Sequence, residues 1–421
     1  MKASRFVATL LLAALFGAAA IAAFNVVVDP YLLFARPRVA GFNALKPAVE
    51  TREALMKAYQ ASRVAPRTVI LGSSRPDIGL DPAAAAWPAA MQPVHNLSLA
   101  GSALGRNLRY LKGLIAVRDG VDLPRTLVIG LDFETFLFRP EPPTGKGRAA
   151  AAPPRAGADP FDRSDVFDAL VRARSRVLPP LLIVKDWVDA SLTLDALLDS
   201  LATVAGNRGG DVLDLSPDGR LSEAQVERWT RSDGVAALFE QKNRATAARL
   251  GDVRFVLGDS PAGLMRGQPR LDELTSLARQ HGMRVVLLVQ PAHASHLELL
   301  DRLGYWAEFE AFKRALCAHA AAGRQAGLDF SVWDFGGYEA YAVEPVPARG
   351  DRSARLAWFW DPLHYTSKLG SLIITAVTTP GSGPAATQQL LPETIEARLS
   401  QVRQDRDDYR RAQAAPERKL P

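Results

Sequence analysis

The sequence predicts an α/β protein built on a doubly wound, mostly parallel sheet. Short apolar runs rich in β-branched residues recur along the chain, and helical patterns separate several of them. Strands that alternate with helices are typical of sheets whose parallel strands are joined by crossover helices.

Five segments have the composition of strands, and they lie at residues 67–71, 95–99, 126–132, 284–289 and 330–334. The segment 126–132 is apolar almost throughout, which indicates a strand covered on both faces. Apolar residues at helical spacing predict helices at residues 104–117, 167–172, 184–201, 271–281, 299–322 and 366–377.

Composition places the chain among globular proteins and favours some partners over others. The 421 residues are 48% hydrophobic and 23% charged, and 51 Lys+Arg against 45 Asp+Glu give a net charge of +6. The basic excess is spread along the chain and forms no basic tract, so we expect no nucleic-acid partner. The single cysteine, Cys317, excludes an internal disulfide and lies in a helical pattern typical of a core residue.

The N-terminus predicts a membrane anchor. Residues 6–28 carry no charge over 23 positions, which is long enough to cross a bilayer as a helix. Lys2 and Arg5 precede this run, so the N-terminus is expected in the cytoplasm and the bulk of the chain outside it. A cleaved signal peptide is the competing interpretation, because small residues at 18–20 offer cleavage sites. The length of the run favours an uncleaved, single-pass anchor in the inner (plasma) membrane, with the bulk in the periplasm.

The domain organisation follows from these patterns. Residues 1–29 are expected to be the anchor, residues 30–377 the α/β domain, and residues 378–421 a partly disordered tail with a frayed helix. A region at about 140–260 begins with a Pro- and Ala-rich stretch and continues with helical patterns. We expect this region to be a helical insertion that caps or lines a site.

A serine near the start of the domain and an Asp-x-x-His pair near its end suggest a triad. Ser74 follows an apolar strand and Gly72, at the sheet edge where sites of open α/β folds form. Asp361 and His364 precede the last helical run of the domain. His364 would act as the base that activates Ser74, and Asp361 would orient the imidazole. Oxyanion donors would be the N–H groups of Ser74 and Gly101.

These blocks resemble the SGNH/GDSL hydrolase family. Gly72-Ser73-Ser74 is similar to its serine block, Gly101 to its second-block glycine, and Asp361-Pro362-Leu363-His364 to its Asp-x-x-His block. The resemblance implies an SGNH-like, flavodoxin-like sheet. It is strongest to the membrane-anchored branch that acts in cell-envelope polysaccharide acetylation and D-alanine transfer.

The third block departs from the family pattern. Where the family has an oxyanion-hole asparagine, this chain has Asp132, at the end of the strand 126–132. An anion that faced the oxyanion would raise the barrier to reaction. We therefore expect Asp132 to point elsewhere, or the oxyanion hole to use another donor such as Asn96.

Further candidates surround this constellation. Arg75 would bind an anionic substrate or pair with Asp77. His293 and His296 follow a strand end, where His293 would contact substrate. A two-histidine metal half-site is disfavoured because Glu298 is the only acidic residue close by in sequence, and we expect neither metal nor cofactor.

A literal Gly-Asp-Ser run at residues 258–260 is an alternative nucleophile turn, but it comes late in the domain and precedes Pro261. Such a short run often occurs by chance.

The sequence thus predicts an extracytoplasmic serine ester hydrolase or O-acyltransferase that acts on a cell-envelope polysaccharide or similar ester. A membrane-bound acyltransferase is the partner that the resemblance implies. The alternative is a non-catalytic subunit that binds polymer or serves as a scaffold for such a machinery.

Overall fold

The computed structural model describes residues 2–140, 162–209, 212–258, 267–379 and 388–414. Asp259 and Ser260 of the alternative nucleophile turn lie outside these ranges, as does most of the Pro- and Ala-rich stretch that opens the expected insertion.

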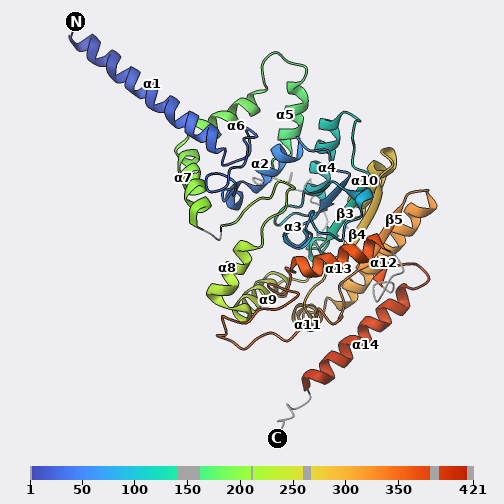
Figure 1. The fold of residues 1–421 in the computed structure, drawn as a ribbon. Coiled ribbons are helices and arrows are strands. Elements are labelled where there is room, and N and C mark those ends of the chain that lie inside the picture. Colours follow the sequence, from blue (N-terminus) through green and yellow to red (C-terminus); the bar gives the residue numbers. More distant parts are fainter. Residues whose placement is uncertain (1, 141–161, 210–211, 259–266, 380–387, 415–421) are drawn as a thin grey trace, which may run out of the picture. The chain divides into compact units, whose positions relative to one another are not determined.

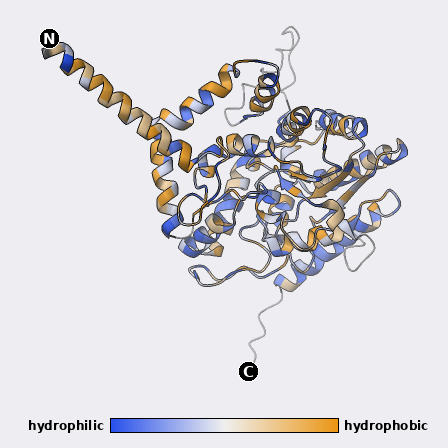
Figure 2. Cartoon of the chain, turned by 45° about the horizontal axis from the view of Figure 1, so that its top comes forward, coloured by the Kyte–Doolittle hydropathy of each residue, from blue (hydrophilic) through white to orange (hydrophobic). Residues whose placement is uncertain are grey.

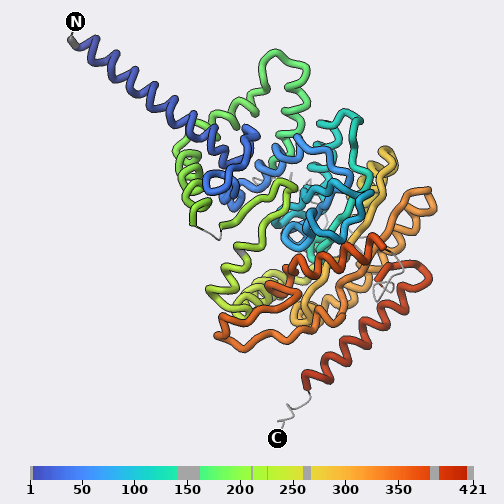
Figure 3. The backbone as a smooth tube through the Cα atoms, viewed as in Figure 1, coloured from blue at the N-terminus to red at the C-terminus, as the bar shows by residue number. Residues whose placement is uncertain are grey.

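The chain divides into two compact units, each built from segments far apart in the sequence. Unit 1 comprises residues 1–65, 109–121 and 160–225, and unit 2 comprises residues 66–108, 122–159 and 226–421. The chain therefore passes from one unit to the other several times. Figure 3 shows the course of the backbone by residue number. The helices after residue 160 therefore belong to the same unit as the N-terminal segment, and those after residue 225 belong to the unit that carries the sheet.

Unit 2 contains the predicted parallel sheet. Its five strands are arranged in the order β2-β1-β3-β4-β5, and every neighbouring pair is parallel. This order is shared by flavodoxin-like sheets. The strands are β1 (Thr68–Leu71), β2 (Val94–Asn96), β3 (Thr126–Leu131), β4 (Arg284–Val289) and β5 (Phe330–Asp334), and Figure 1 shows several of them among the helices.

The strand order determines where a site can form. The chain moves from β1 to β2 on one side, and then returns to place β3 on the other side of β1. Loops that leave the carboxyl ends of β1 and β3 therefore diverge at this point, which is where open α/β sheets bind their ligands. Helix α3 (Ser74–Gly79) begins directly after β1, and α4 (Leu104–Arg118) joins β2 to β3.

The hydrophobic core of unit 2 includes α13 (Ser367–Thr378), the helix that follows Asp361 and His364. Its Ile373 and Ile374 share one buried cluster with Ile70 of β1 and Val128 of β3. Since α13 also contacts α3, the two segments that carry the candidate serine and histidine are held by the same core.

Two of the expected helices are interrupted. The stretch 299–322 contains the end of α11 (Ala294–Arg302) and most of α12 (Trp306–Gln325). Gly304, with φ of +78°, separates these helices because glycine readily adopts this left-handed conformation at a helix end. The stretch 184–201 is divided between α6 (Leu181–Leu192) and α7 (Leu194–Gly209). Extended Thr193 accepts the Ala196 N–H through its hydroxyl, as a residue at a helix start does.

Other helices complete the two units. Unit 1 contains α1 (Lys2–Val28), α2 (Val49–Ala61) and α5 (Asp165–Ala173) together with α6 and α7. The remaining helices are α8 (Ala224–Asp233), α9 (Val235–Gly251), α10 (Gln268–Gln280) and α14 (Ile395–Ala414). Helix α14 differs from the expected frayed tail, because Leu399 and Val402 are buried and Arg398 pairs with Asp334 at the end of β5.

Helix α1 is long and apolar enough to cross a membrane. The candidate span covers Ala3–Val28, and none of its most apolar part is buried inside the protein. Figure 2 shows this helix as almost continuously hydrophobic. The C-terminal end of α1 is fixed in unit 1, since the Lys46 ammonium donates to the carbonyls of Val28 and Asp29 at 2.9 and 2.8 Å. Burial lowers the pKa of Lys46 to about 8.

Candidate active site

The structure brings Ser74, His364 and Asp361 together in one hydrogen-bonded chain. The Ser74 hydroxyl lies 2.7 Å from His364 Nε2, although the two residues are 290 positions apart. On the other side of the ring, His364 Nδ1 lies 2.7 Å from Asp361 Oδ2. This is the order of contacts in which a carboxylate orients an imidazole and the imidazole accepts a serine proton.

The nucleophile turn is shaped by glycine. Gly72 has φ of +152°, and a Cβ added to it would lie 2.4 Å from Pro76 Cγ. The following Ser73 accepts the Arg75 N–H through its hydroxyl at the start of α3. The sequence therefore turns sharply from β1 into α3, and Ser74 becomes the first residue of that helix.

The Asp361 turn is stabilised by its own carboxylate. Asp361 Oδ1 accepts the N–H groups of Leu363 and His364 at 2.8 and 2.9 Å, and Oδ2 faces the ring. Burial alone would raise the pKa of Asp361, but the neighbouring His364 ring and these N–H donors hold it well below its ordinary value. Asp361 is therefore ionised at neutral pH and able to stabilise an imidazolium.

Asp132 lies at the same sheet edge and is paired with a cation. Its carboxylate is 3.2 Å from the guanidinium of Arg75, the residue after Ser74. Burial raises the pKa of Asp132 and Arg75 opposes this shift. Arg75 thus pairs with Asp132, and also with Glu134 at 3.8 Å, and not with Asp77, the partner expected from the sequence.

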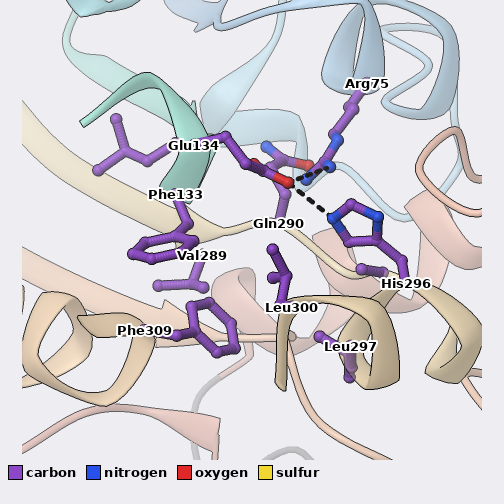
Figure 4. A pocket seen from close by; sticks show the side chains of 11 residues that line it. Arg75, Phe133, Glu134, Val289, Gln290, His296, Leu297, Leu300 and Phe309 are labelled. Atoms are coloured by element: carbon purple, nitrogen blue, oxygen red, sulfur yellow. Dashed lines mark hydrogen bonds and ion pairs between the residues drawn. The ribbon is translucent and has the colours of Figure 1, made fainter. Parts of the chain in front are cut away.

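Glu134 connects Arg75 to a second histidine. Its carboxylate lies 2.7 Å from His296 Nε2, and both side chains are almost fully buried. Burial by itself would raise the pKa of Glu134, but Arg75 and His296 together lower it well below its ordinary value. Figure 4 shows Glu134 between the other two residues, with dashed lines for both contacts.

These charged residues border a small cavity. Its volume is about 10 Å³, which is room for roughly one water molecule and too little for an acyl group. Apolar side chains line much of it, including Phe133 and Phe309 (Figure 4). Ser74 and His364 are not among the lining residues, so this cavity is not the place where an ester would bind.

The remaining oxyanion candidates have different surroundings. The Asn96 amide nitrogen donates to the carbonyls of Pro76 and Leu80 at 2.9 and 3.1 Å, and its oxygen accepts the Ser98 N–H. Asn96 thus connects α3 to β2 through hydrogen bonds. Gly101 is exposed in the loop after β2, with φ of +64°, and the same loop is bonded to the nucleophile turn through the Leu99 N–H and the Gly72 carbonyl.

His293 occupies a buried position at the start of α11. Its Nδ1 accepts the Ser295 N–H, and its Nε2 donates to the Glu344 carbonyl at 2.8 Å. Burial lowers the pKa of His293, which favours the neutral ring that these two contacts require. Within the described ranges, no three His, Cys, Asp or Glu side chains are grouped so that they could hold a metal ion.

The sequence did not predict Glu134 or Gln290 in the site, and it offered His296 only as a group beside substrate or half of a metal site, without its partner Glu134. All three follow the ends of β3 and β4, and that position at the carboxyl edge of a parallel sheet was the available signal. Gln290 packs over β3, since a Cβ added to Gly130 would lie 1.7 Å from its amide nitrogen.

No protein-family model, curated protein or solved structure matches this chain. The fold and the geometry themselves define the class: an α/β protein with a five-stranded parallel sheet, a candidate membrane helix at its N-terminus, and a hydrogen-bonded Ser-His-Asp set whose serine follows β1.

Proposed function

We propose that this chain is a membrane-anchored serine ester hydrolase or O-acyltransferase. The observation that carries the proposal is the chain of two 2.7 Å contacts from Ser74 through His364 to Asp361. A serine hydroxyl becomes an effective nucleophile only when a base within hydrogen-bond reach takes its proton. The resemblance of the serine and Asp-x-x-His blocks to SGNH/GDSL hydrolases supports the same chemistry.

The reaction would proceed in two halves. Ser74 Oγ attacks the ester carbonyl carbon while its proton moves to His364 Nε2. The tetrahedral intermediate then expels the alcohol, which takes that proton as it leaves, and the acyl group remains on Ser74. In the second half, water or an acceptor hydroxyl gives its proton to His364 and attacks the acyl carbon. The bond to Ser74 Oγ then breaks, and His364 returns the proton to that oxygen.

The Ser74 N–H is the first candidate donor to the oxyanion, because it belongs to the attacking residue itself. The Arg75 guanidinium supplies positive charge beside the serine turn, and Asp132 and Glu134 offset it. Arg75 therefore holds Asp132, the carboxylate that departs from the family pattern, in an ion pair.

The compartment and substrate class belong to the same proposal. Helix α1 would anchor the protein in the inner membrane, and Lys2 and Arg5 at its start favour a periplasmic location for the rest of the chain. The ester would belong to a cell-envelope polysaccharide or similar polymer, as in the SGNH-like branch that the motifs resemble.

The first test is turnover of a small acetyl ester by the full-length protein. Ser74→Ala is expected to lower turnover by more than about a thousandfold, because the nucleophile is lost. Ser371→Ala is a matched control, since that hydroxyl only bonds the Ser367 carbonyl within α13, and it should leave turnover unchanged. Equal turnover by wild type and Ser74→Ala would refute the proposal.

A buried carboxylate beside the serine turn favours one alternative, a non-catalytic subunit that binds polymer. When ionised, Asp132 has the charge that would oppose an oxyanion, although burial raises its pKa and Arg75 opposes this shift. A subunit of this kind would bind an acetylated polysaccharide equally well with Ser74 or Ala at position 74, and it would turn over no ester.

A further inference from the structure

Helices α6 and α7 are hydrophobic on the side that faces away from their own unit. In α6 the exposed large hydrophobic side chains are Leu181, Val184, Trp187, Val188 and Leu192, and in α7 they are Leu194, Leu198 and Leu201. Leu181 is 83% exposed and Leu194 is 68% exposed. Large apolar side chains gathered on one exposed face mark a surface that something apolar covers.

Helical spacing places these residues on one stripe of each helix. Residues 181, 184, 188 and 192 follow intervals of three and four along α6, as do residues 194, 198 and 201 along α7. The stripes are therefore continuous faces of the two helices.

The buried sides of both helices are the less hydrophobic ones. In α6, Asp186 and Ala190 are buried together with Ile183, and Asp186 accepts hydrogen bonds from Tyr59 and Arg163. In α7 the buried residues are Ala196, Ser200 and Thr203. This is the reverse of the pattern in a water-facing helix, where the hydrophobic stripe packs inward and the polar side faces solvent.

The position of the two helices identifies what covers them. Both pack against α1, the candidate membrane span. Asn25 near the C-terminal end of α1 donates to the carbonyl of Ser191, close to the junction between α6 and α7, and Tyr31 bonds Asp199 of α7 at 2.6 Å. Figure 1 shows α6 and α7 beside this end of α1.

The depth of this junction matches the membrane boundary. A bilayer core is spanned by about 20 helical residues, so a span that begins after Arg5 reaches the opposite boundary near Asn25. The exposed stripes of α6 and α7 therefore begin where α1 leaves the hydrocarbon, and α1 itself exposes Leu10, Leu15 and Val27. Exposed apolar side chains thus occur on the span and on both helices that pack against it, and Figure 2 colours the residues of α1 by their hydropathy.

We propose that α6 and α7 lie in the bilayer interface beside the membrane span, with the exposed hydrophobic stripes of both helices in contact with the acyl chains. The partner is thus a lipid monolayer. Trp187 flanks the stripe, as aromatic residues do at this depth. Lys185 and Asp189, at the other edge, pair with each other at 2.5 Å.

This surface would fix the orientation of unit 1 on the membrane, since it adds a second attachment to the one made by α1. It is a property of unit 1 alone and holds whether or not Ser74 is a nucleophile.

The test places a polarity-sensitive fluorophore on the stripe of the full-length protein in phospholipid vesicles. Cys317→Ala removes the native thiol, and Leu198→Cys or Leu181→Cys then carries the label, with Lys112→Cys on the exposed side of α4 as the control. Because both leucine side chains are exposed, labelling there removes no core contact.

The proposal predicts a blue-shifted emission at positions 181 and 198 and strong quenching by lipids brominated on their acyl chains, with neither effect at position 112. Water-like emission with no acyl-chain quenching at both stripe positions would overturn it. A blue shift that depends on protein density in the vesicles, without acyl-chain quenching, would also overturn it, because a second copy of the chain would then cover the face.

Discussion

The guanidinium of Arg75 lies 3.2 Å from the carboxylate of Asp132. Arg75 is the residue that follows the candidate nucleophile, Ser74. This contact joins the turn after β1 to the turn after β3, the two loops that diverge at the switch point of the sheet. It also places the carboxylate that departs from the SGNH/GDSL pattern opposite a fixed cation. The consequences of this pairing can be tested by substitution.

Asp132→Asn is expected to raise the rate of ester turnover, by roughly tenfold. The substitution replaces a carboxylate beside the serine turn by a neutral amide that can donate an N–H, and one oxyanion-hole donor is worth about 10²–10³ in other enzymes. The rise should appear in kcat, measured at neutral pH with the full-length protein. A lower kcat with unchanged thermal stability would show instead that the Asp132 carboxylate assists the reaction.

Asp361→Asn is expected to lower kcat by roughly 10³–10⁴-fold, since an amide no longer fixes the required tautomer of His364 or stabilises its charged form. KM should change much less, because Asp361 is buried behind the ring. The split between kcat and KM distinguishes this outcome from unfolding. A fall of less than tenfold in kcat would contradict the triad.

Asn96→Asp tests whether the Asn96 side chain stabilises the position of α3. Its amide nitrogen donates to the carbonyls of Pro76 and Leu80, and a carboxylate of the same shape would face those oxygens without a proton to donate. We expect a loss of roughly 1–3 kcal/mol in the free energy of unfolding, measured by denaturant titration. Unchanged stability combined with a loss of kcat would assign Asn96 to the oxyanion hole instead.

Glu134→Gln tests the buried contacts of Glu134 with Arg75 and His296 through the pH dependence of the free energy of unfolding. Glu134 has a lowered pKa in the folded protein, so its contribution to stability is fully present above the ordinary glutamate pKa and is lost as pH falls through the lower folded value. The stability difference between wild type and Glu134→Gln should therefore be constant above about pH 5 and shrink below about pH 4. A difference that grows as the pH falls would contradict this assignment.

The sheet could be predicted from sequence because its strands are short, apolar and bounded by turn residues. Each of the five predicted segments contains a strand of one parallel sheet, although only residues 95 and 96 of the segment 95–99 belong to β2. Helix boundaries were less accurate where one residue interrupts a long pattern. Gly304 divides the stretch 299–322 and Thr193 divides 184–201. The spacing of apolar residues alone reveals neither break.

The candidate triad could be proposed because its residues occur in short blocks with a recognisable order. The Glu134-His296 pair could not, because the two residues are 162 positions apart and each is unremarkable in its own segment. Arg398 shows the same limit. In a charged C-terminal stretch it suggests a solvated tail, yet it is buried against Asp334 through tertiary packing.

Reaction of the full-length protein with a fluorophosphonate, followed by peptide mapping, tests the central claim most directly. We expect a covalent adduct on Ser74 in the wild type, because His364 activates that hydroxyl, and no adduct in Ser74→Ala or His364→Asn. A folded wild-type protein that remains unlabelled at Ser74 would contradict the account.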